Sequence, residues 1–426
     1  MSDLSPTQRF NRISECGLCI GCGVCQSIAG ESRIQMKVTE LGSQRPVVLR
    51  DLDHEVVDLI YDVCPGTRVE GLPTNLHDEN TVHDPVWGEY QNIVMAYASN
   101  PEVRFKASTG GVLSALALYL IAEKKVDFIL HARASTKYPS FGEAHISENV
   151  DDVMQGAGSR YGPTASLIDV HSALDRNQPF AYIGKPCDIA TLRNLARHDE
   201  RVDRLVKYWL APVCGGFSPP PATQRFLNSI SVSWEQLKFM RYRGHGCPGP
   251  VHVETHDGRK IEKNYIDLWG EDETQWSLPF RCKVCPDGIG EAADVAASDN
   301  WPGGGPEREG QEKDPGTNAV IARTAAGARL MSEAEQSGYL TIESTIGIEE
   351  MNLYQPHQVN KKYSVWSRHK GLREAGQLAP ETSRLRIAEL ASSMDDEFNR
   401  YQTEGTKKRV MDGKTREPTP SAPQKI

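Results

Sequence analysis

Five cysteines near the amino terminus stand at a spacing that suits metal chemistry. Cys16, Cys19, Cys22 and Cys25 are separated by two residues each, and Cys64 follows in Tyr-Asp-Val-Cys-Pro. Two intervening residues let successive thiols curl around one centre, and the intervening glycines let the backbone bend closely around it. A C-x2-C-x2-C run with a later cysteine before proline is an arrangement that binds a four-iron cluster. We therefore predict a 4Fe-4S cluster on Cys19, Cys22, Cys25 and Cys64.

Two alternatives to this assignment remain at the level of sequence. In the first, Cys16 to Cys25 bind the cluster alone, which requires one tight loop to reach all four corners. In the second, the metal is zinc, but tetrahedral zinc normally uses two C-x2-C pairs on separate knuckles rather than cysteines in tandem. The preferred set leaves Cys16 without a role.

Four dispersed cysteines form a second candidate metal site: Cys187, Cys214, Cys282 and Cys285. Cys187 and Cys214 each follow a predicted strand, and parallel strands would bring both thiols to the same carboxyl-terminal edge of a sheet. The C-x2-C pair at 282–285 would complete four ligands, although any one of these cysteines alone could be a buried inert residue. The tenth cysteine, Cys247, is either structural or faces a redox centre or substrate.

The elements that must position these cysteines alternate between strands and helices. Apolar runs predict strands at 93–96, 126–130, 180–184, 205–213 and 320–322, and helical segments at 108–123, 163–174, 189–196 and 323–336. This alternation predicts an α/β layer with parallel pairing. A hairpin is predicted at 251–265 around a His-Asp-Gly turn.

Three regions are expected. Residues 1–75 form a ferredoxin-like iron–sulfur module, residues 90–370 a mixed α/β domain, and residues 371–426 a charged tail. The tail contains one amphipathic helix near 384–401, and its polar composition from Gly405 onward predicts disorder.

Net charge, hydropathy and the first residues of the chain argue against nucleic-acid binding, a membrane span and secretion. The net charge of −9 disfavours a nucleic-acid-binding protein, which needs a basic face. No apolar run reaches the roughly 18 residues of a membrane span, and the first 15 residues lack a secretory signal. A cytoplasmic location follows as the default, and in a reducing compartment ten cysteines favour metal or redox chemistry over disulfides.

Several longer motifs follow one another along the chain: CIGCGVC, VCPG, ASTGGVLSALALYL, GSRYGP, YIGKPCDIATL, APVCGG, RCKVCPDG with ADVAASDNWPGG, and GTNAVIARTAAG. In this order, over most of residues 16–330, they resemble the coenzyme F-420 hydrogenase/dehydrogenase beta-subunit family. This family includes 7-hydroxymethyl chlorophyll a reductase and a ferredoxin-dependent divinyl chlorophyllide vinyl reductase. Its members are FAD proteins with one or more four-iron clusters, so the resemblance implies FAD and supports the second cluster.

The resemblance also implies residues that face the flavin. They are Ser108, Thr109, Gly110 and Gly111 at a helix start, and Ser159, Arg160 and Tyr161, with Arg160 at a position where the family usually has lysine. A helix start offers free N–H groups and a favourable dipole to a pyrophosphate, although the same residues also make an ordinary helix cap. Upstream, Arg104 and Lys106 could add positive charge. Asp294, Asp299 and Trp301 match a family motif in part and lie either near the cofactor or in a capped turn.

These features predict an oxidoreductase in which cofactors convert single electrons into hydride chemistry. The expected order is an external carrier such as ferredoxin, the two clusters, FAD and a small organic substrate or deazaflavin coenzyme. Tyr161, Lys185 and His245 are the candidate proton donors. The alternatives are an electron-transfer beta subunit of a larger hydrogenase or dehydrogenase complex and a non-catalytic iron–sulfur partner.

Overall fold

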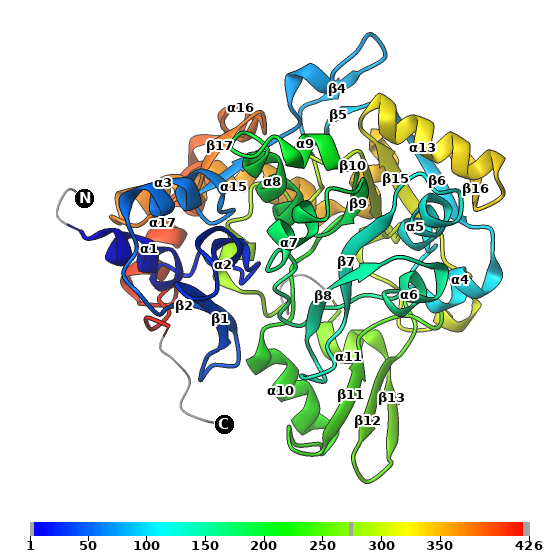
Figure 1. Ribbon diagram of the computed structural model, residues 1–426, viewed down its shortest axis with the longest axis horizontal. Coiled ribbons are helices and arrows are strands. Elements are labelled where there is room, and N and C mark those ends of the chain that lie inside the picture. The colour runs from blue at the N-terminus through cyan, green and yellow to red at the C-terminus, as the bar shows by residue number, and fades with distance from the viewer. Residues whose placement is uncertain (1–3, 272–275, 421–426) are drawn as a thin grey trace.

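One large mixed β-sheet of eight strands forms the centre of the molecule (Figure 1). The computed structural model describes residues 4–271 and 276–420. Across the sheet the strands are β16 (Leu340–Thr345), β6 (Asn92–Ala98), β15 (Asn318–Ala322), β14 (Val295–Ser298), β10 (Val206–Pro212), β9 (Phe180–Ile183), β7 (Phe128–Ala134) and β8 (Gly142–Ser147).

The four middle strands carry the parallel pairing that the sequence predicts. β7, β9, β10 and β14 run parallel to one another, whereas β8, β15, β6 and β16 pair antiparallel. The mixed α/β class is therefore confirmed, but parallel pairing is wrong for the predicted strands 93–96 and 320–322. The segment between β14 and β15 contains only two short 3-10 turns, η2 (Pro302–Gly304) and η3 (Gln311–Lys313), and no long crossover helix. Without such a crossover the chain returns antiparallel.

Helices cover both faces of the sheet. On one face lie α5 (Val112–Ala122) and α13 (Ala325–Gln336), and on the other α7 (Val170–Asp175), α8 (Pro186–Leu195) and α9 (Arg201–Leu205). Because side chains alternate along a strand, Ala181 of β9 joins the first core while Phe180 and Tyr182 join the second. Of the predicted helix 163–174, only the part from Val170 onward is helical.

The amino-terminal module consists of short helices and a hairpin. It comprises α1 (Pro6–Glu15), α2 (Val24–Ala29), β1 (Ile34–Val38), β2 (Gln44–Val48), α3 (His54–Val63) and β3 (Arg68–Glu70). Ser5 and Gln8 form a capping box at α1, and Asp53 caps α3 by accepting from the N–H of Val56. Its ferredoxin-like character stays a prediction.

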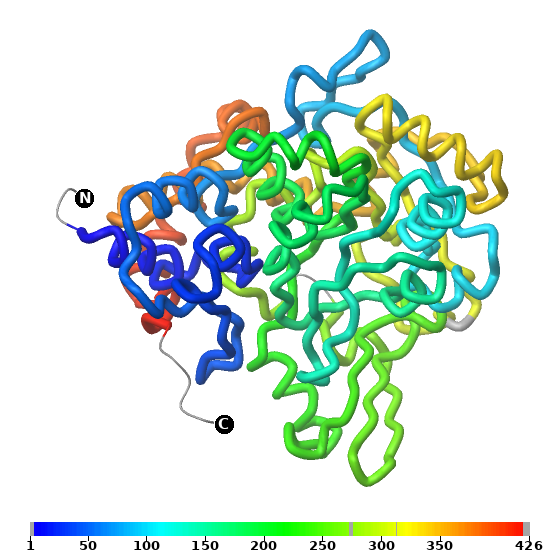
Figure 2. The backbone as a smooth tube through the Cα atoms, in the orientation of Figure 1, coloured from blue at the N-terminus to red at the C-terminus, as the bar shows by residue number. Residues whose placement is uncertain are grey.

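The carboxyl-terminal helices pack against this module. α15 (Pro356–Glu374) and α17 (Asp396–Met411) share a core with α1. α16 (Ile387–Ser392) packs near β3, and β17 (Glu381–Ser383) pairs with β3. In the backbone trace the blue and red ends of the chain run together (Figure 2). The predicted helix 384–401 is split into two, and the disorder predicted from Gly405 is wrong up to Met411. Thr403, Thr406 and Val410, spaced to lie on one face of α17, are buried there.

The remaining elements lie around the sheet. They are the hairpin β4 (Val82–Asp84) and β5 (Gly88–Tyr90), the three-stranded sheet β11 (Leu237–Arg241), β12 (Val251–Thr255) and β13 (Lys260–Lys263), the helices α4 (Pro101–Lys106), α6 (Val150–Gln155), α10 (Pro220–Ser229), α11 (Tyr265–Trp269), α12 (Phe280–Lys283) and α14 (Ile348–Tyr354), and the 3-10 turn η1 (Thr74–Leu76). The predicted hairpin at 251–265 is present as β12 and β13. Within the described residues, no helix combines the length and apolar character needed to cross a bilayer.

Candidate metal centres and active site

Four amino-terminal cysteines line one small cavity. They are Cys19, Cys22, Cys25 and Cys64, the predicted set. Gly23 begins α2 with φ +87, a left-handed conformation that lets the loop turn Cys22 and Cys25 toward the same space. Cys64 arrives from the end of α3. Cys16 is buried at the end of α1 and is not among the residues that line the cavity.

The surroundings of these thiols suit a negatively charged centre. The N–H of Gly21 donates to Cys19 Sγ (3.3 Å) and the N–H of Gly66 to Cys64 Sγ (3.4 Å). Burial raises the pKa of Cys64 to about 12 and raises that of Cys19, although the nearby Arg45 guanidinium opposes the latter shift. Free thiols here would be protonated, whereas a bound metal would hold them as thiolates. N–H groups that donate to sulfur are among the features that tune iron–sulfur clusters.

The spacing of the donors argues against zinc. In the described part of the chain, no three Cys, His, Asp or Glu side chains converge closely enough to hold a single metal ion. Tetrahedral zinc requires all four sulfurs within about 2.3 Å of one point. Four thiols arranged around a cavity instead fit a centre with several irons, so the donor set suits a cluster.

The second predicted set also converges. Cys187, Cys214, Cys282 and Cys285 line a single cavity at the carboxyl-terminal edge of the parallel strands. Cys187 lies in the first turn of α8 after β9, and Cys214 follows β10, so the parallel pair delivers both as predicted. Burial raises the pKa of Cys282 to about 12, a shift that the neighbouring Lys361 and Arg281 oppose.

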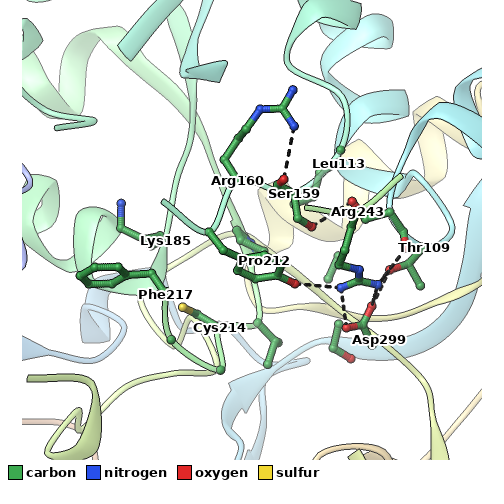
Figure 3. Close-up of a pocket in the computed structure, with 18 of the residues that line it drawn as sticks. Thr109, Leu113, Ser159, Arg160, Lys185, Pro212, Cys214, Phe217, Arg243 and Asp299 are labelled. Carbon is green, nitrogen blue, oxygen red and sulfur yellow. Dashed lines mark hydrogen bonds and ion pairs between the residues drawn. The ribbon is translucent and has the colours of Figure 1, made fainter. Parts of the chain in front are cut away.

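A larger cavity of about 340 Å³ opens at the same edge of the sheet. Figure 3 shows part of its lining, with Thr109, Arg243 and Asp299 on one side and Lys185, Cys214 and Phe217 on the other. Its volume falls within the range of small-molecule sites, and its place at the ends of parallel strands is where α/β sheets bind ligands.

Most of the predicted flavin-facing residues line this cavity. They are Ser108, Thr109, Gly111, Ser159, Arg160 and Tyr161. Gly111 caps α5 in a left-handed conformation (φ +76), so the helix start faces the cavity as predicted. Gly110 lies behind it, where a Cβ would come within 2.8 Å of the Asn318 backbone nitrogen. Asp299 and Trp301 line the cavity too.

Four predicted residues lie elsewhere. Lys106 does not line the cavity and forms an ion pair with Glu102 (2.7 Å). His245 is exposed, contacts Phe105 (ring centroids 5.5 Å apart) and does not line the large cavity, so the structure does not bring it to the other candidates. Arg104 stacks on Tyr97 and donates to the Gly316 carbonyl (2.6 Å) rather than facing the cavity. Asp294 is buried and accepts from the backbone N–H of Trp209 (3.0 Å) and from Thr324 Oγ1 (2.8 Å), which gives it a structural role.

Arg243 is a central residue that the sequence did not reveal. Its guanidinium donates to both carboxylate oxygens of Asp299 (2.9 and 3.0 Å), and its Nη2 to the Ser108 carbonyl (2.8 Å) and Thr109 Oγ1 (3.0 Å). It also donates to Tyr161 Oη (3.1 Å). Thr109 Oγ1 donates in turn to Asp299. Arg243 therefore joins three segments of the cavity wall, as Figure 3 shows.

The lining carries further groups suited to recognition. Among the described residues no carboxylate forms an ion pair with Arg160, and its Nε lacks a hydrogen-bond partner. Burial and the neighbouring Arg241 lower the pKa of Arg160 to about 10. An aromatic wall consists of Tyr161, Tyr265, Trp269, Trp276 and Trp301, of which the sequence pointed only to Tyr161 and Trp301.

The three cavities are contiguous in their linings. Lys185 and Cys214 line both the second cysteine site and the large cavity, and Ile20 lines all three. Lys185 Nζ pairs with Asp188 (2.7 Å). Burial lowers the pKa of Lys185, but Asp188 together with Cys187 and Cys214 raises it, and the net shift is upward. The two cysteine sites and the large cavity therefore adjoin one another.

Comparison with known proteins identifies the family. Residues 93–171 match a model of the amino-terminal part of the coenzyme F420 hydrogenase/dehydrogenase beta subunit, and residues 178–346 match its carboxyl-terminal part. Together these matches cover more than half of the chain. The residues before 93, including the first cysteine set, lie outside both.

Individual relatives are distant. The chain is 23% identical over 257 residues to an F420-dependent formate dehydrogenase subunit beta of Methanocaldococcus jannaschii, covering 59% of this chain and 61% of that protein. It is 25% identical over 284 residues to a coenzyme F420 hydrogenase subunit beta of Methanococcus voltae, covering 65% and 92%. The chain thus spans less than two thirds of the formate dehydrogenase subunit.

A solved structure shares the fold. A chain in the xenon-derivatised F420-reducing [NiFe] hydrogenase complex from Methanosarcina barkeri superposes with a TM-score of 0.51 at 19% identity, covering 66% of this chain and 92% of that one. Combined with the two family matches, this places the molecule plainly: it belongs to the coenzyme F420 hydrogenase/dehydrogenase beta-subunit family of oxidoreductase subunits.

Proposed function

We propose that this protein is an iron–sulfur flavoprotein oxidoreductase with two 4Fe-4S clusters and one FAD. The observation that carries the proposal is the contiguity of the three cavities, with Cys214 and Lys185 shared between the second cysteine site and the large cavity. In such a protein clusters exchange single electrons and a flavin exchanges hydride, so the pair links a one-electron carrier such as ferredoxin to a two-electron substrate.

The large cavity offers the groups that FAD requires. The start of α5 supplies backbone N–H groups and a positive dipole end to a pyrophosphate. Arg160 adds a guanidinium without a carboxylate partner among the described residues, which suits an anionic ligand. Arg243 holds this wall in place through Ser108 and Thr109.

We propose two side chains of the cavity lining as proton donors to the substrate. Lys185 Nζ is fixed by Asp188, which keeps the ammonium charged and directed. The hydroxyl of Tyr161 lines the cavity and accepts from Arg243, so it keeps a proton that it can donate. We assign these two residues the donor role and assign none to the exposed His245.

The substrate class follows from the aromatic wall. Trp269, Trp301 and the tyrosines beside them present ring faces and edges to the cavity, which favours a planar conjugated molecule. A deazaflavin coenzyme fits this description, and the relatives are named as F420-dependent or F420 hydrogenase subunits. The ten free thiols agree with a reducing cytoplasm.

A second candidate function is an electron-transfer beta subunit within a larger complex. It is favoured by the relatives' names, which describe subunits of formate dehydrogenase and hydrogenase, and by the solved chain of a hydrogenase complex. The two functions differ in whether the isolated chain turns over a substrate.

Anaerobic purification with counts of iron, sulfide and flavin tests the proposal. About eight irons and one FAD per chain are expected, since each four-iron cluster contributes four. Replacing Cys282 and Cys285 by serine should lower the iron to about four while the first site stays loaded. Bound zinc, or a purified chain without iron or flavin, would refute the proposal. Reduction of deazaflavin coenzyme by the isolated chain then separates the first function from the second.

A further inference from the structure

Arg281 is a buried cation placed between the two cysteine sites. Only 1% of its surface is exposed, and its Nε and Nη2 donate to the carbonyl of Pro65 (3.0 and 2.5 Å). Pro65 follows Cys64 of the first site, whereas Arg281 precedes Cys282 of the second and lines the second cavity. One side chain therefore ties the two metal-binding loops together.

The charge of Arg281 has no carboxylate counterpart. Four arginines are buried among the described residues. Arg45 pairs with Glu417 (2.6 Å) and Arg243 with Asp299 (2.9 Å). Arg323 lies in the field of Glu291 and Asp287. For Arg281 no ion pair with a described carboxylate exists, and the charges that act on it most are the thiols of Cys285, Cys187 and Cys282.

A buried arginine must be compensated, because removing an isolated ion from water costs several kcal/mol. Protonated thiols supply no such charge. Four thiolates around an iron–sulfur core do, and both sites flank the guanidinium, since Arg281 also acts electrostatically on Cys64 of the first site. The missing carboxylate is thus explained if both sites are anionic.

We propose that Arg281 is the shared counter-cation of the two cysteine-held clusters and raises the reduction potential of both. This inference rests on the proposed function. When a cluster accepts one electron from the carrier, its net charge becomes more negative by one, and a fixed cation stabilises that reduced state. The same guanidinium lines the second cavity and bonds to the residue after Cys64 of the first site, so it favours reduction at each of them.

Lys361 provides a matched comparison. It lines the second cavity and acts electrostatically on Cys214 and Cys282. Like Arg281, it does not line the first cavity, but it is not among the charged groups that act most on Cys64, and within the described residues it has no bond to Pro65 such as Arg281 makes. Lys361→Met should therefore alter one cluster, whereas Arg281→Met should alter two.

The test is a redox titration of the anaerobically purified full-length protein, followed by electron paramagnetic resonance. Arg281→Met should lower both midpoint potentials, with a roughly tenfold change in each reduction equilibrium for a unit charge at such range, which is about 59 mV for a one-electron step. Lys361→Met should lower only the potential of the second cluster. Arg281→Lys keeps the charge while losing the planar fork, so both potentials should stay near those of the wild type.

Two results of the titration overturn the shared role. In the first, Arg281→Met leaves the midpoint potential of either cluster unchanged. In the second, the midpoint potentials of Arg281→Lys fall as far as those of Arg281→Met. If Arg281→Met assembles neither cluster but Arg281→Lys assembles both, the charge is required and the inference holds. Loss of only one cluster in Arg281→Met refutes it. A wild-type chain without clusters overturns the proposed function itself and is recognised by its iron content before any titration.

Discussion

Replacing Arg243 by methionine should destabilise the protein and weaken its retention of a flavin together. Methionine keeps much of the length of the side chain but removes the guanidinium that bonds to Asp299, Ser108 and Thr109. The Asp299 carboxylate would then lie partly buried without its partner. Both effects follow from one network because it supports the wall that carries the predicted cofactor residues.

The size of the effect follows from burial. Removing one partner of a buried ion pair costs about 3–5 kcal/mol. The side chain of Arg243 is 4% exposed but that of Asp299 is 25% exposed, so water reaches one member of the pair. We therefore expect the free energy of unfolding to fall by about 3 kcal/mol, the lower end of this range. Unfolding entropy of about 2.1 cal/mol/K per residue gives roughly 0.9 kcal/mol/K for a chain of this size, hence a fall in Tm of about 3–4 °C.

Thermal unfolding followed by circular dichroism, with flavin counted per chain, measures both effects. The control is Arg133→Met, which removes a pair with Glu143 (3.0 Å) whose side chains are 28% and 27% exposed. Such a pair contributes about 0–1 kcal/mol, so Tm should fall by about 1 °C or less. Combining Arg243→Met with Asp299→Asn should recover part of the loss, because the two residues are coupled. Equal Tm values for Arg243→Met and Arg133→Met would refute the reasoning.

Three further predictions concern the cysteines, the carboxyl-terminal segment and pH. Cys19→Ser should lower the iron content by about four per chain, as expected for one lost cluster. Cys16→Ser should leave the iron content unchanged, because Cys16 does not line the cavity. Equal losses of iron in the two variants would contradict the proposed ligand set. Glu417→Gln removes the charge that compensates the buried Arg45 and should speed the loss of iron from the first site to a chelator. An unchanged rate would show that the ion pair of Arg45 and Glu417 does not protect this site. Burial lowers the pKa of His131 to about 4, so the unfolded chain binds more protons than the folded one between about pH 6.5 and 4. The free energy of unfolding should therefore fall by up to about 1.4 kcal/mol per pH unit as pH drops through this range. His131→Gln should reduce that slope in unfolding measurements. An identical slope in the variant would exclude His131 as its source.

The cysteine sites were largely predictable from sequence because their chemistry lies in residue type and local spacing. The run from Cys16 to Cys25 constrains a loop, and a cysteine before proline marks its partner at Cys64. Prediction of the second set also required that β9 and β10 run parallel. Strands joined by a helical crossover usually pair in parallel, and the structure confirms this pairing.

Other features depend on tertiary contacts that local pattern does not encode. Arg243 and Arg281 look in the sequence like any other arginines, and only their burial distinguishes them. His245 is a candidate proton donor by residue type, but in the structure its side chain is exposed and does not line the large cavity. Helix α17 is polar along most of its length, so its packing onto α15 through a few small buried side chains escaped notice.

The cover of the first cysteine site comes from the far end of the chain. The Thr415 carbonyl lies so close to Gly17 that a Cβ there would approach it to 2.2 Å, and Glu417 closes over Arg45. During synthesis the four thiols leave the ribosome some 350–400 residues before these covering residues, an interval of roughly 20–80 s at 5–20 residues per second. Throughout that interval the thiols are exposed to oxidation, and the site of the proposed cluster is open to iron. The covering residues close over the site only after this interval.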